Sequence, residues 1–215
     1  MSKIIRPLFV TLEGGEGAGK TTLLKRLEST LTQQGYQMKV TREPGGTSLG
    51  KAIRSWILEK RSPPIAHMSE LLLFLADRAQ HLEEVIRPAL KEHQIVLCDR
   101  FNDSTVSYQG IARGLGMEFV HNLCEQVCEG LIPDLTLYLD LNPSIGIDRV
   151  RKARILDPME TEHVAFHQKI REGFLTLASL YPERIKVVDA QQNPEQVYQQ
   201  SLALLEAKIT LQNYV

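Results

Sequence analysis

A glycine-rich stretch near the start of the chain has the residue types and spacing that bind polyphosphates. Gly14, Gly19, Lys20 and Thr21 satisfy the pattern G-x-x-x-x-G-K-[ST], between an apolar run at 8–12 and a helical pattern. Glycines let successive backbone N–H groups turn toward an anion, and the helix that follows adds its positive N-terminal end. Lys20, expected to be exposed to the ligand, would contact the β- and γ-phosphates, and the Thr21 hydroxyl would bind Mg²⁺. The predicted nucleotide-binding loop comprises Gly14, Gly15, Glu16, Gly17, Ala18, Gly19, Lys20, Thr21 and Thr22.

A second charged pair, Asp99-Arg100, follows a continuous apolar run at 94–98. Such a run is typical of a central parallel strand, and ligands bind beyond the carboxyl ends of these strands. Asp99 has the type and position to hold Mg²⁺ directly or through water, and the planar fork of Arg100 suits a phosphate. An isolated Asp-Arg pair is more often a solvated ion pair, but its position after this strand favours a functional site.

Arg42 follows another expected strand, and Arg54 lies on the next expected helix. Together with Arg100 they could surround a phosphate other than those of the triphosphate, which implies an acceptor that is itself phosphorylated. The alternative for Arg54 is a solvated charge on a helix surface. Glu16 is a carboxylate inside a phosphate-binding loop, where charge repulsion argues against a placement without function.

Five short apolar segments are typical of strands and alternate with segments of helical periodicity. The expected strands are residues 8–12, 37–41, 94–98, 134–140 and 184–188. The expected helices are residues 20–35, 48–58, 69–90, 117–128, 160–180 and 194–209, with one more that begins at Pro143 after the N-cap Asn142. Ser69 is expected to cap the helix 69–90, whose buried side is predicted to comprise Leu71, Leu72, Leu75 and Ala79. Right-handed crossovers would give an α/β three-layer sandwich, a five-stranded parallel sheet with helices on both faces.

Length and composition set limits on function. At 215 residues the chain fits one domain, 1–215, and a net charge of −1 gives no field toward nucleic acid or an anionic membrane. No apolar window is long enough to span a bilayer and no signal peptide is evident, so a cytoplasmic protein is expected. Cys124 and Cys128 are one helical turn apart and are expected to pack in the core with Cys98. The six histidines lack the spacing of metal ligands.

Three segments carry a family resemblance. They are TREPGGT at 41–47, FLADR at 74–78, and Asp99-Arg100 followed by Ser104-Thr105 and Tyr108-Gln109-Gly110. With these segments the chain resembles the thymidylate (dTMP) kinase family essentially from end to end, whereas the GTPase motifs D-x-x-G and N-K-x-D are absent. The resemblance implies phosphorylation of dTMP to dTDP by ATP with Mg²⁺, and a homodimer. Alternatives are another nucleoside or deoxynucleoside monophosphate kinase, or a nucleotide-dependent switch without a small acceptor.

The resemblance also implies a role for each residue of the acceptor site. Phe74 and Arg78 are four residues apart, so they share a helix face and could present a ring for base stacking beside a donor fork. Ser104 and Thr105 would meet the pyrimidine edge or fix Arg78, and Tyr108 would pack beneath the deoxyribose. The implied dTMP-binding residues are Glu16, Arg42, Pro44, Arg54, Phe74, Arg78, Arg100, Ser104, Thr105, Tyr108 and Gln109. The implied catalytic residues are Glu16, Lys20, Asp99, Arg100, Arg151 and Arg154.

A lid is expected at about 149–162. The residue after Glu16 is Gly17 rather than an arginine, and in this the chain resembles the class of the family that takes its catalytic arginine from the lid. The family pattern R-x-R-x-R-G-E is altered here, because the third arginine is displaced by one residue and Pro158 replaces the arginine expected after Asp157. Pro158 is expected to stop the helix. On that helix Arg151 and Arg154 would lie about 60° apart and could approach one phosphate, with Arg149 nearer the adenosine. The alternative is a solvated basic face. Asp189-Ala190 resembles the loop that lines adenine.

Overall fold

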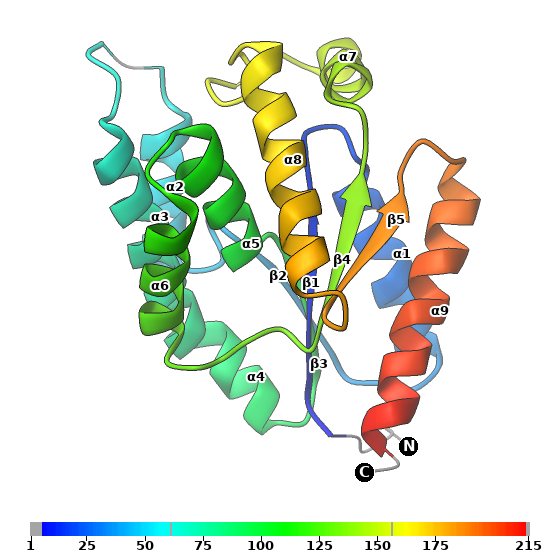
Figure 1. Ribbon diagram of the computed structural model, residues 1–215. Coiled ribbons are helices and arrows are strands. Elements are labelled where there is room, and N and C mark those ends of the chain that lie inside the picture. The colour runs from blue at the N-terminus through cyan, green and yellow to red at the C-terminus, as the bar shows by residue number, and fades with distance from the viewer. Residues whose placement is uncertain (1–5, 61, 156, 214–215) are drawn as a thin grey trace.

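The computed structural model describes residues 6–60, 62–155 and 157–213, and its centre is a five-stranded parallel sheet (Figure 1). The strands have the order β2-β3-β1-β4-β5. They are β1 (Leu8–Gly14), β2 (Met38–Arg42), β3 (Ile95–Asp99), β4 (Leu135–Asp140) and β5 (Ile185–Asp189). The predicted sheet is therefore confirmed, with each boundary within two residues of its expected place. Since all strands are parallel, their carboxyl ends meet at one edge.

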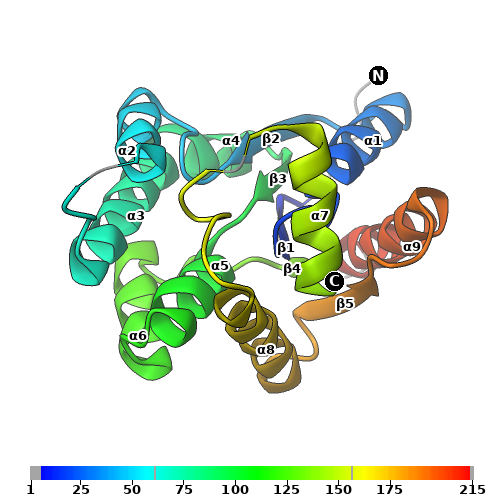
Figure 2. The same ribbon diagram turned by 90° about the horizontal axis from the view of Figure 1, so that it is seen from above.

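Helices cover both faces of the sheet, as predicted (Figure 2). Alternate residues of β1 point to opposite faces: Leu8, Val10 and Leu12 pack with one helical layer and Phe9 with the other. The first layer contains α1 (Lys20–Gln33) and α9 (Pro194–Asn213), and the second contains α3 (His67–His81), α6 (Met117–Cys128) and α8 (Val164–Leu180). Helix α2 (Ser48–Leu58) packs on α3, outside the sheet. The core thus fixes the strand ends from both sides.

The helix expected at 69–90 differs from its prediction at both its start and its buried side. Helix α3 begins at His67 after the N-cap Ala66, so Ser69 is not its cap. The helix continues through a π-helical turn, η1 (Leu82–Ile86), into α4 (Arg87–Lys91). Leu72, with 54% of its side chain exposed, and Ala79 lie outside the core, because α3 turns Leu71 and Leu75 inward together with charged residues.

Two connections at the carboxyl edge also differ from expectation. The polar stretch 101–116, where the pattern indicates no regular element, is helical as α5 (Asn102–Thr105) and η2 (Val106–Ala112). Helix α7 (Pro143–Ala153) begins after its N-cap Asn142, as predicted, but ends before Pro158. Helix α8 starts at Val164 rather than 160, because Asp157 and Glu160 bond each other's backbone N–H in a separate turn. Helix α7 crosses the carboxyl edge of the sheet (Figure 2).

None of the helices in the described part of the chain is both long and apolar enough to cross a membrane.

Candidate active site

The phosphate-binding loop connects the carboxyl end of β1 to the start of α1. Gly19, at the N-cap of α1, has a φ of 93°, a conformation that L side chains rarely adopt. The ammonium of Lys20 donates hydrogen bonds to the carbonyl oxygens of Gly14 (2.9 Å) and Gly15 (3.0 Å). Lys20 is buried, whereas the sequence prediction had it exposed to the ligand. Its pKa is lowered, and burial is the largest cause. A bound polyphosphate would offer this ammonium anionic partners in place of the two carbonyls.

The two predicted metal ligands lie together at the ends of α1 and β3. The hydroxyl of Thr21 donates to one carboxylate oxygen of Asp99 over 3.4 Å, and the other oxygen, Oδ1, is buried without a hydrogen-bond partner among the described residues. Mg²⁺ prefers such oxygen ligands and commonly takes its remaining ligands from water and substrate phosphates. Among the residues that the structure describes, no group of three His, Cys, Asp or Glu side chains could hold a metal without such help. The oxygen atoms of Thr21 and Asp99 therefore fit a Mg²⁺ site whose other ligands come from water and substrate phosphates.

Glu16 and Arg100 form an ion pair of 2.7 Å at the centre of the carboxyl edge. Arg100 has a φ of 70°, and its fork also donates to the carbonyl of Gly14 (3.1 Å). The hydroxyl of Tyr108 donates to Glu16 over 2.9 Å. Burial by itself would raise the pKa of the Glu16 carboxyl, but Arg100 and Lys20 outweigh it and lower that pKa to about 2. Glu16 is therefore ionised at neutral pH, with a fixed orientation.

The three arginines expected around a second phosphate do lie together. Arg42, Arg54 and Arg100 line a cavity of about 460 Å³ that also contains the phosphate-binding loop. Arg54 donates to the carbonyl of Pro44 over 3.1 Å, which fixes its side chain beside the 43–46 loop. The pKa of Arg54 is lowered first by burial and then by Arg42 and Arg100. Three guanidinium groups that repel one another in this way form a site suited to an anion.

A smaller cavity of about 120 Å³ adjoins the first. The residues that line both cavities are Glu16, Glu43, Arg54, Arg100, Arg154 and Glu160. The predicted acceptor residues that line it are Glu16, Pro44, Arg54, Phe74, Arg78, Arg100, Ser104, Thr105, Tyr108 and Gln109, whereas Arg42 lines only the larger cavity. Arg154 and the lid residues Asp157, Met159 and Glu160 line it too, although only Arg154 had been assigned a role. Sequence reasoning missed the other lining residues, which are Glu43, Ile57, Leu58 and Phe101. Segments far apart in the chain thus enclose one pocket beside the phosphate-binding loop.

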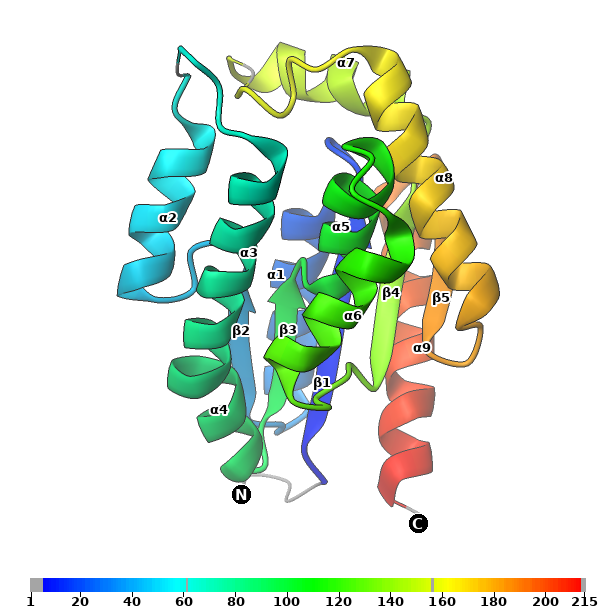
Figure 3. The ribbon, with the colours of Figure 1, turned by 60° about the vertical axis from the view of Figure 1, so that its left-hand side comes forward.

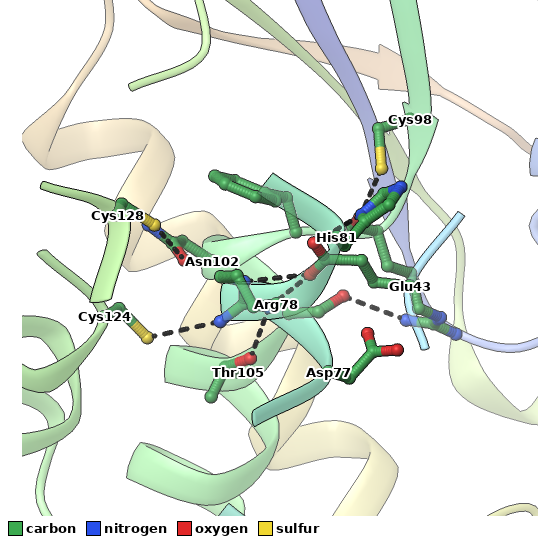
Figure 4. Close-up of polar contacts among 12 residues, drawn as sticks. Glu43, Asp77, Arg78, His81, Cys98, Asn102, Thr105, Cys124 and Cys128 are labelled. Atoms are coloured by element: carbon green, nitrogen blue, oxygen red, sulfur yellow. Dashed lines mark hydrogen bonds and ion pairs between the residues drawn. The ribbon is translucent and has the colours of Figure 1, made fainter. Parts of the chain in front are cut away.

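A buried ionic network fixes one wall of this pocket (Figure 4). The carboxylate of Glu43 accepts from Arg78 (2.8 Å) through one oxygen and contacts the Nδ1 atom of His81 (2.9 Å) through the other. Arg78, 1% exposed, also donates to the hydroxyl of Thr105 (3.0 Å) and to the sulfur of Cys124 (3.6 Å). Of the two roles predicted for Thr105, fixing Arg78 is the one seen. The available sequence signal for Glu43 was its place within the TREPGGT segment.

Glu13, the last charged residue of β1 before the loop, is another side chain that sequence reasoning missed. Its carboxylate accepts from the backbone N–H of Phe101 (2.7 Å) and from the hydroxyl of Ser104 (2.5 Å). Burial, followed by repulsion from Asp103, raises the pKa of Glu13 to about 8. These bonds fix the turn that contains Arg100. A carboxylate inside an apolar strand was the available signal.

The arginines of the segment 149–162 are arranged differently from the prediction. Because α7 ends at Ala153, Arg154 has extended backbone and pairs with buried Glu160 (2.8 and 2.5 Å). The prediction that Arg151 and Arg154 share a helix face is therefore wrong. The guanidinium of Arg151 instead lies 3.6 Å from the carboxylate of Asp148, and Arg151 lines neither cavity. Arg149 lines the larger cavity, and Arg154 lines both.

Helix α7 lies directly against the phosphate-binding loop. A Cβ atom on Gly17 would come within 2.2 Å of the carbonyl oxygen of Gly146, so a side chain at Gly17 would collide with α7. Arg149 donates to the carbonyls of Gly17 (3.3 Å) and Ala190 (3.4 Å). Arg149 thus lies beside the loop after β5.

That loop after β5 forms a further cavity of about 350 Å³ against α1 and α9. Ala190 lines it as expected, whereas the carboxylate of Asp189 accepts from the backbone N–H of Gln191 over 2.9 Å. The guanidinium of Arg26 lies 3.9 Å from the ring centroid of Tyr198 in the same cavity. Arg26 and Tyr198 had no sequence signal, because they come from two helices far apart in the chain, half-buried Arg26 from α1 and buried Tyr198 from α9.

The cysteines are buried in the core, as the packing prediction states. Cys98, Cys124 and Cys128 are free thiols, each at most 1% exposed. Burial raises the pKa of each thiol, which keeps them protonated at neutral pH. They contribute packing and weak polar contacts rather than reactivity.

Comparisons with known proteins give a consistent result. A family model described as thymidylate kinase matches residues 12–201. The chain is 48% identical over 206 residues to the thymidylate kinase of Protochlamydia amoebophila, with 92% of each chain covered. It is 43% identical over 203 residues to that of Geobacillus thermodenitrificans, covering 94% of this chain and 90% of the relative. Among solved structures it resembles thymidylate kinase from Ehrlichia chaffeensis, with a TM-score of 0.75, 30% identity and coverage of 93% and 98%.

Proposed function

This chain belongs to the thymidylate kinase family, and we propose that it transfers the γ-phosphoryl group of ATP to dTMP, giving ADP and dTDP. The observation that carries this proposal is the junction of two cavities at Glu16, Arg54 and Arg100, one holding the phosphate-binding loop and the other the ring-lined acceptor pocket. A donor phosphate and an acceptor phosphate bound there would lie close together. Positioning and charge neutralisation supply most of the catalysis in phosphoryl transfer.

On the donor side, residues 14–22 would hold the triphosphate of ATP through backbone N–H groups and the ammonium of Lys20. Thr21 and Asp99 would hold Mg²⁺, which would offset the negative charge of the phosphate groups during transfer. The carboxylate oxygen of Asp99 that lacks a partner among the described residues supports this assignment. Arg26 and Tyr198 would border the adenosine, in the cavity beside Ala190.

On the acceptor side, Arg42, Arg54 and Arg100 would hold the phosphate of dTMP. Phe74 would stack on the thymine, an interaction worth about 1–3 kcal/mol. The ionised carboxylate of Glu16 would accept a hydrogen bond from the 3′-hydroxyl of the sugar. Since the acceptor phosphate is already an oxyanion at neutral pH, no side chain is needed to remove a proton from it.

We propose further that the chain is one domain with a lid at about 149–162, and that Arg154 is the lid arginine of catalysis. Arg154 lines both the donor and the acceptor cavity, and Arg151 lines neither. In this role Arg154 would exchange Glu160 for the transferring phosphoryl group. An arginine used only in the transition state lowers kcat and leaves both KM values nearly unchanged when it is removed. Alanine variants of Arg149, Arg151 and Arg154 should therefore show the kcat loss at Arg154, and a loss confined to Arg151 would refute the assignment.

We also propose a homodimer and a cytoplasmic location, with neither nucleic acid nor membrane as a partner. Helices α3 and α6 contact each other and expose the large apolar side chains of Met68, Leu72 and Phe119. Large apolar side chains exposed on two packed helices are typical of an interface. Leu72→Glu should give a monomer in light scattering, whereas Leu211→Glu, an exposed leucine on α9, should leave the dimer intact. The nucleotide substrates support the proposed cytoplasmic location. The net charge of −1 supports the proposal that neither nucleic acid nor a membrane is a partner.

ADP formation in the presence of different monophosphates tests the proposed reaction. We expect strong stimulation by dTMP, and weaker stimulation by dUMP, dCMP and dGMP. Preference for another monophosphate would indicate a kinase of different specificity. ADP formation that no monophosphate stimulates would support a nucleotide-dependent switch and refute the kinase proposal.

A further inference from the structure

Arg113, at the C-terminal end of η2, contacts carboxylates from two distant parts of the chain. Its Nε and Nη2 atoms lie 3.3 Å from the two oxygens of Glu70 on α3. Its Nη1 atom donates to Glu162, just before α8, over 2.6 Å. Arg113 and Glu70 are nearly buried, at 13% and 8% side-chain exposure, and Glu162 is 31% exposed. One guanidinium thus joins α3, η2 and the end of the proposed lid.

The Glu70 end of this cluster belongs to the acceptor pocket. Glu70 lies one helical turn before Phe74 on α3, and its Oε1 atom accepts from the side-chain amide of Gln109 over 2.8 Å. Phe74 and Gln109 both line the acceptor cavity, whereas Arg113 and Glu162 do not. The position of Arg113 is therefore set by the residues that surround the acceptor.

The other end of the cluster fixes the segment that follows α7. Besides Glu162, Arg113 contacts the sulfur of Met159 at 3.5 Å, and its guanidinium lies 4.5 Å from the ring centroid of Phe166. Met159 lines the acceptor cavity. Figure 3 shows this connection between α7 and α8 running along the upper edge of the molecule toward the α2–α3 connection. Arg154, Asp157 and Glu160 belong to the same connection and are joined to each other by hydrogen bonds.

We propose that Arg113 is a positioning residue that couples a filled acceptor pocket to a closed lid. This inference rests on the proposed function and adds to it the residue through which the two sites communicate. Without the guanidinium, the carboxylates of Glu70 and Glu162 would face each other, and like charges would push the lid away from α3. With the guanidinium present, an acceptor that orders α3 and η2 also holds Glu162 through Arg113. Glu162 in turn keeps Arg154 over the donor cavity. Because coupling is reciprocal, each substrate should bind more tightly when the other is present.

The test is the ratio of two dissociation constants, measured by calorimetry on the full chain. They are the constants of a non-hydrolysable ATP analogue with Mg²⁺, in the absence and in the presence of saturating dTMP. Glu162→Gln is the decisive variant, because it removes the charge of the lid contact and leaves the buried Glu70–Arg113 pair in place. Arg113→Gln removes both. Glu129→Gln is the matched control, because it breaks an ion pair of the same kind, to Arg87 at 2.7 Å, far from either cavity.

For the wild type we expect a ratio of at least about fivefold, in the usual range for coupled sites. Glu162→Gln should reduce it at least about threefold, which is the upper range for one partly exposed ion pair. Affinity for dTMP alone should stay nearly constant, Arg113→Gln should reduce the ratio more than Glu162→Gln, and Glu129→Gln should leave it unchanged.

A ratio near one in the wild type, or an unchanged ratio in Glu162→Gln, overturns the inference. An equal reduction in Glu129→Gln also overturns it, because the effect would then not be specific to the lid. If Arg113→Gln fails to fold, Glu162→Gln alone decides. Phosphorylation of dTMP by a wild type without coupling overturns only this inference, whereas absence of dTMP-dependent ADP formation overturns the proposed function together with it.

Discussion

The buried Glu43–Arg78 pair gives a quantitative prediction for stability. Glu43 and Arg78 are 3% and 1% exposed, their atoms lie 2.8 Å apart, and the second oxygen of Glu43 contacts His81 at 2.9 Å. Removing one partner of a buried pair costs about 3–5 kcal/mol, because it leaves the other charge unpaired in the interior. In Glu43→Gln the amide oxygen keeps one hydrogen bond, worth about 1 kcal/mol. We therefore expect the free energy of unfolding to fall by about 2–4 kcal/mol.

For a chain of this length the loss corresponds to a melting temperature lower by about 4–16 °C. Urea unfolding followed by circular dichroism measures the free energy directly, and scanning calorimetry measures the temperature. Glu129→Gln serves as the control, since the side chain of Glu129 is 68% exposed and its pair with Arg87 should contribute at most about 1 kcal/mol. A Glu43→Gln variant as stable as this control would refute the reasoning, because the buried pair would then contribute no more than a surface pair.

Four further predictions concern the site and its loops. Lys20→Met should lower kcat by about 10²–10³ or more through loss of a charge aimed at the transferring phosphoryl group, and steady-state turnover above a tenth of wild type would contradict its role. Arg42→Ala should weaken dTMP binding far more than ATP binding in calorimetry, because Arg42 belongs with Arg54 and Arg100 to the group proposed to hold the acceptor phosphate and not to the phosphate-binding loop. The opposite order would mean that the two sites are reversed. Tyr108→Ala should relax discrimination against the ribonucleotide by opening space at the 2′ position, whereas an equal loss of kcat/KM for both acceptors would leave Tyr108 as packing only. Burial, and then Glu43, raise the pKa of Asp77 from 3.8 to about 6, so stability should fall as pH rises through that range. Asp77→Asn should accordingly raise the urea midpoint at about pH 8 more than at about pH 4, and an equal change at both pH values would show that Asp77 does not titrate in the folded state.

The sequence by itself determined the fold class and predicted most of the residues that line the candidate site. Strand and helix periodicity are local patterns, and a parallel sheet then brings its carboxyl ends to one edge, whatever the details of packing. That argument places the loop at 14–22, the Asp99-Arg100 pair and Arg42 near one another, as the structure has them. The capping pair Asn142-Pro143 was likewise a local signal, and α7 begins there.

Only the tertiary structure decided how individual charges are used. Helix α7 ends at Ala153, and the next residue, Arg154, pairs with buried Glu160. Arg151 and Arg154 therefore do not share the helix face that was expected. Glu13 acquires its role by reaching the turn after β3, and Arg113 reaches Glu70 and Glu162, which lie 43 and 49 residues away in the chain. Such contacts leave no periodic trace, because a buried charge is stabilised by whichever partner the fold brings within about 3 Å.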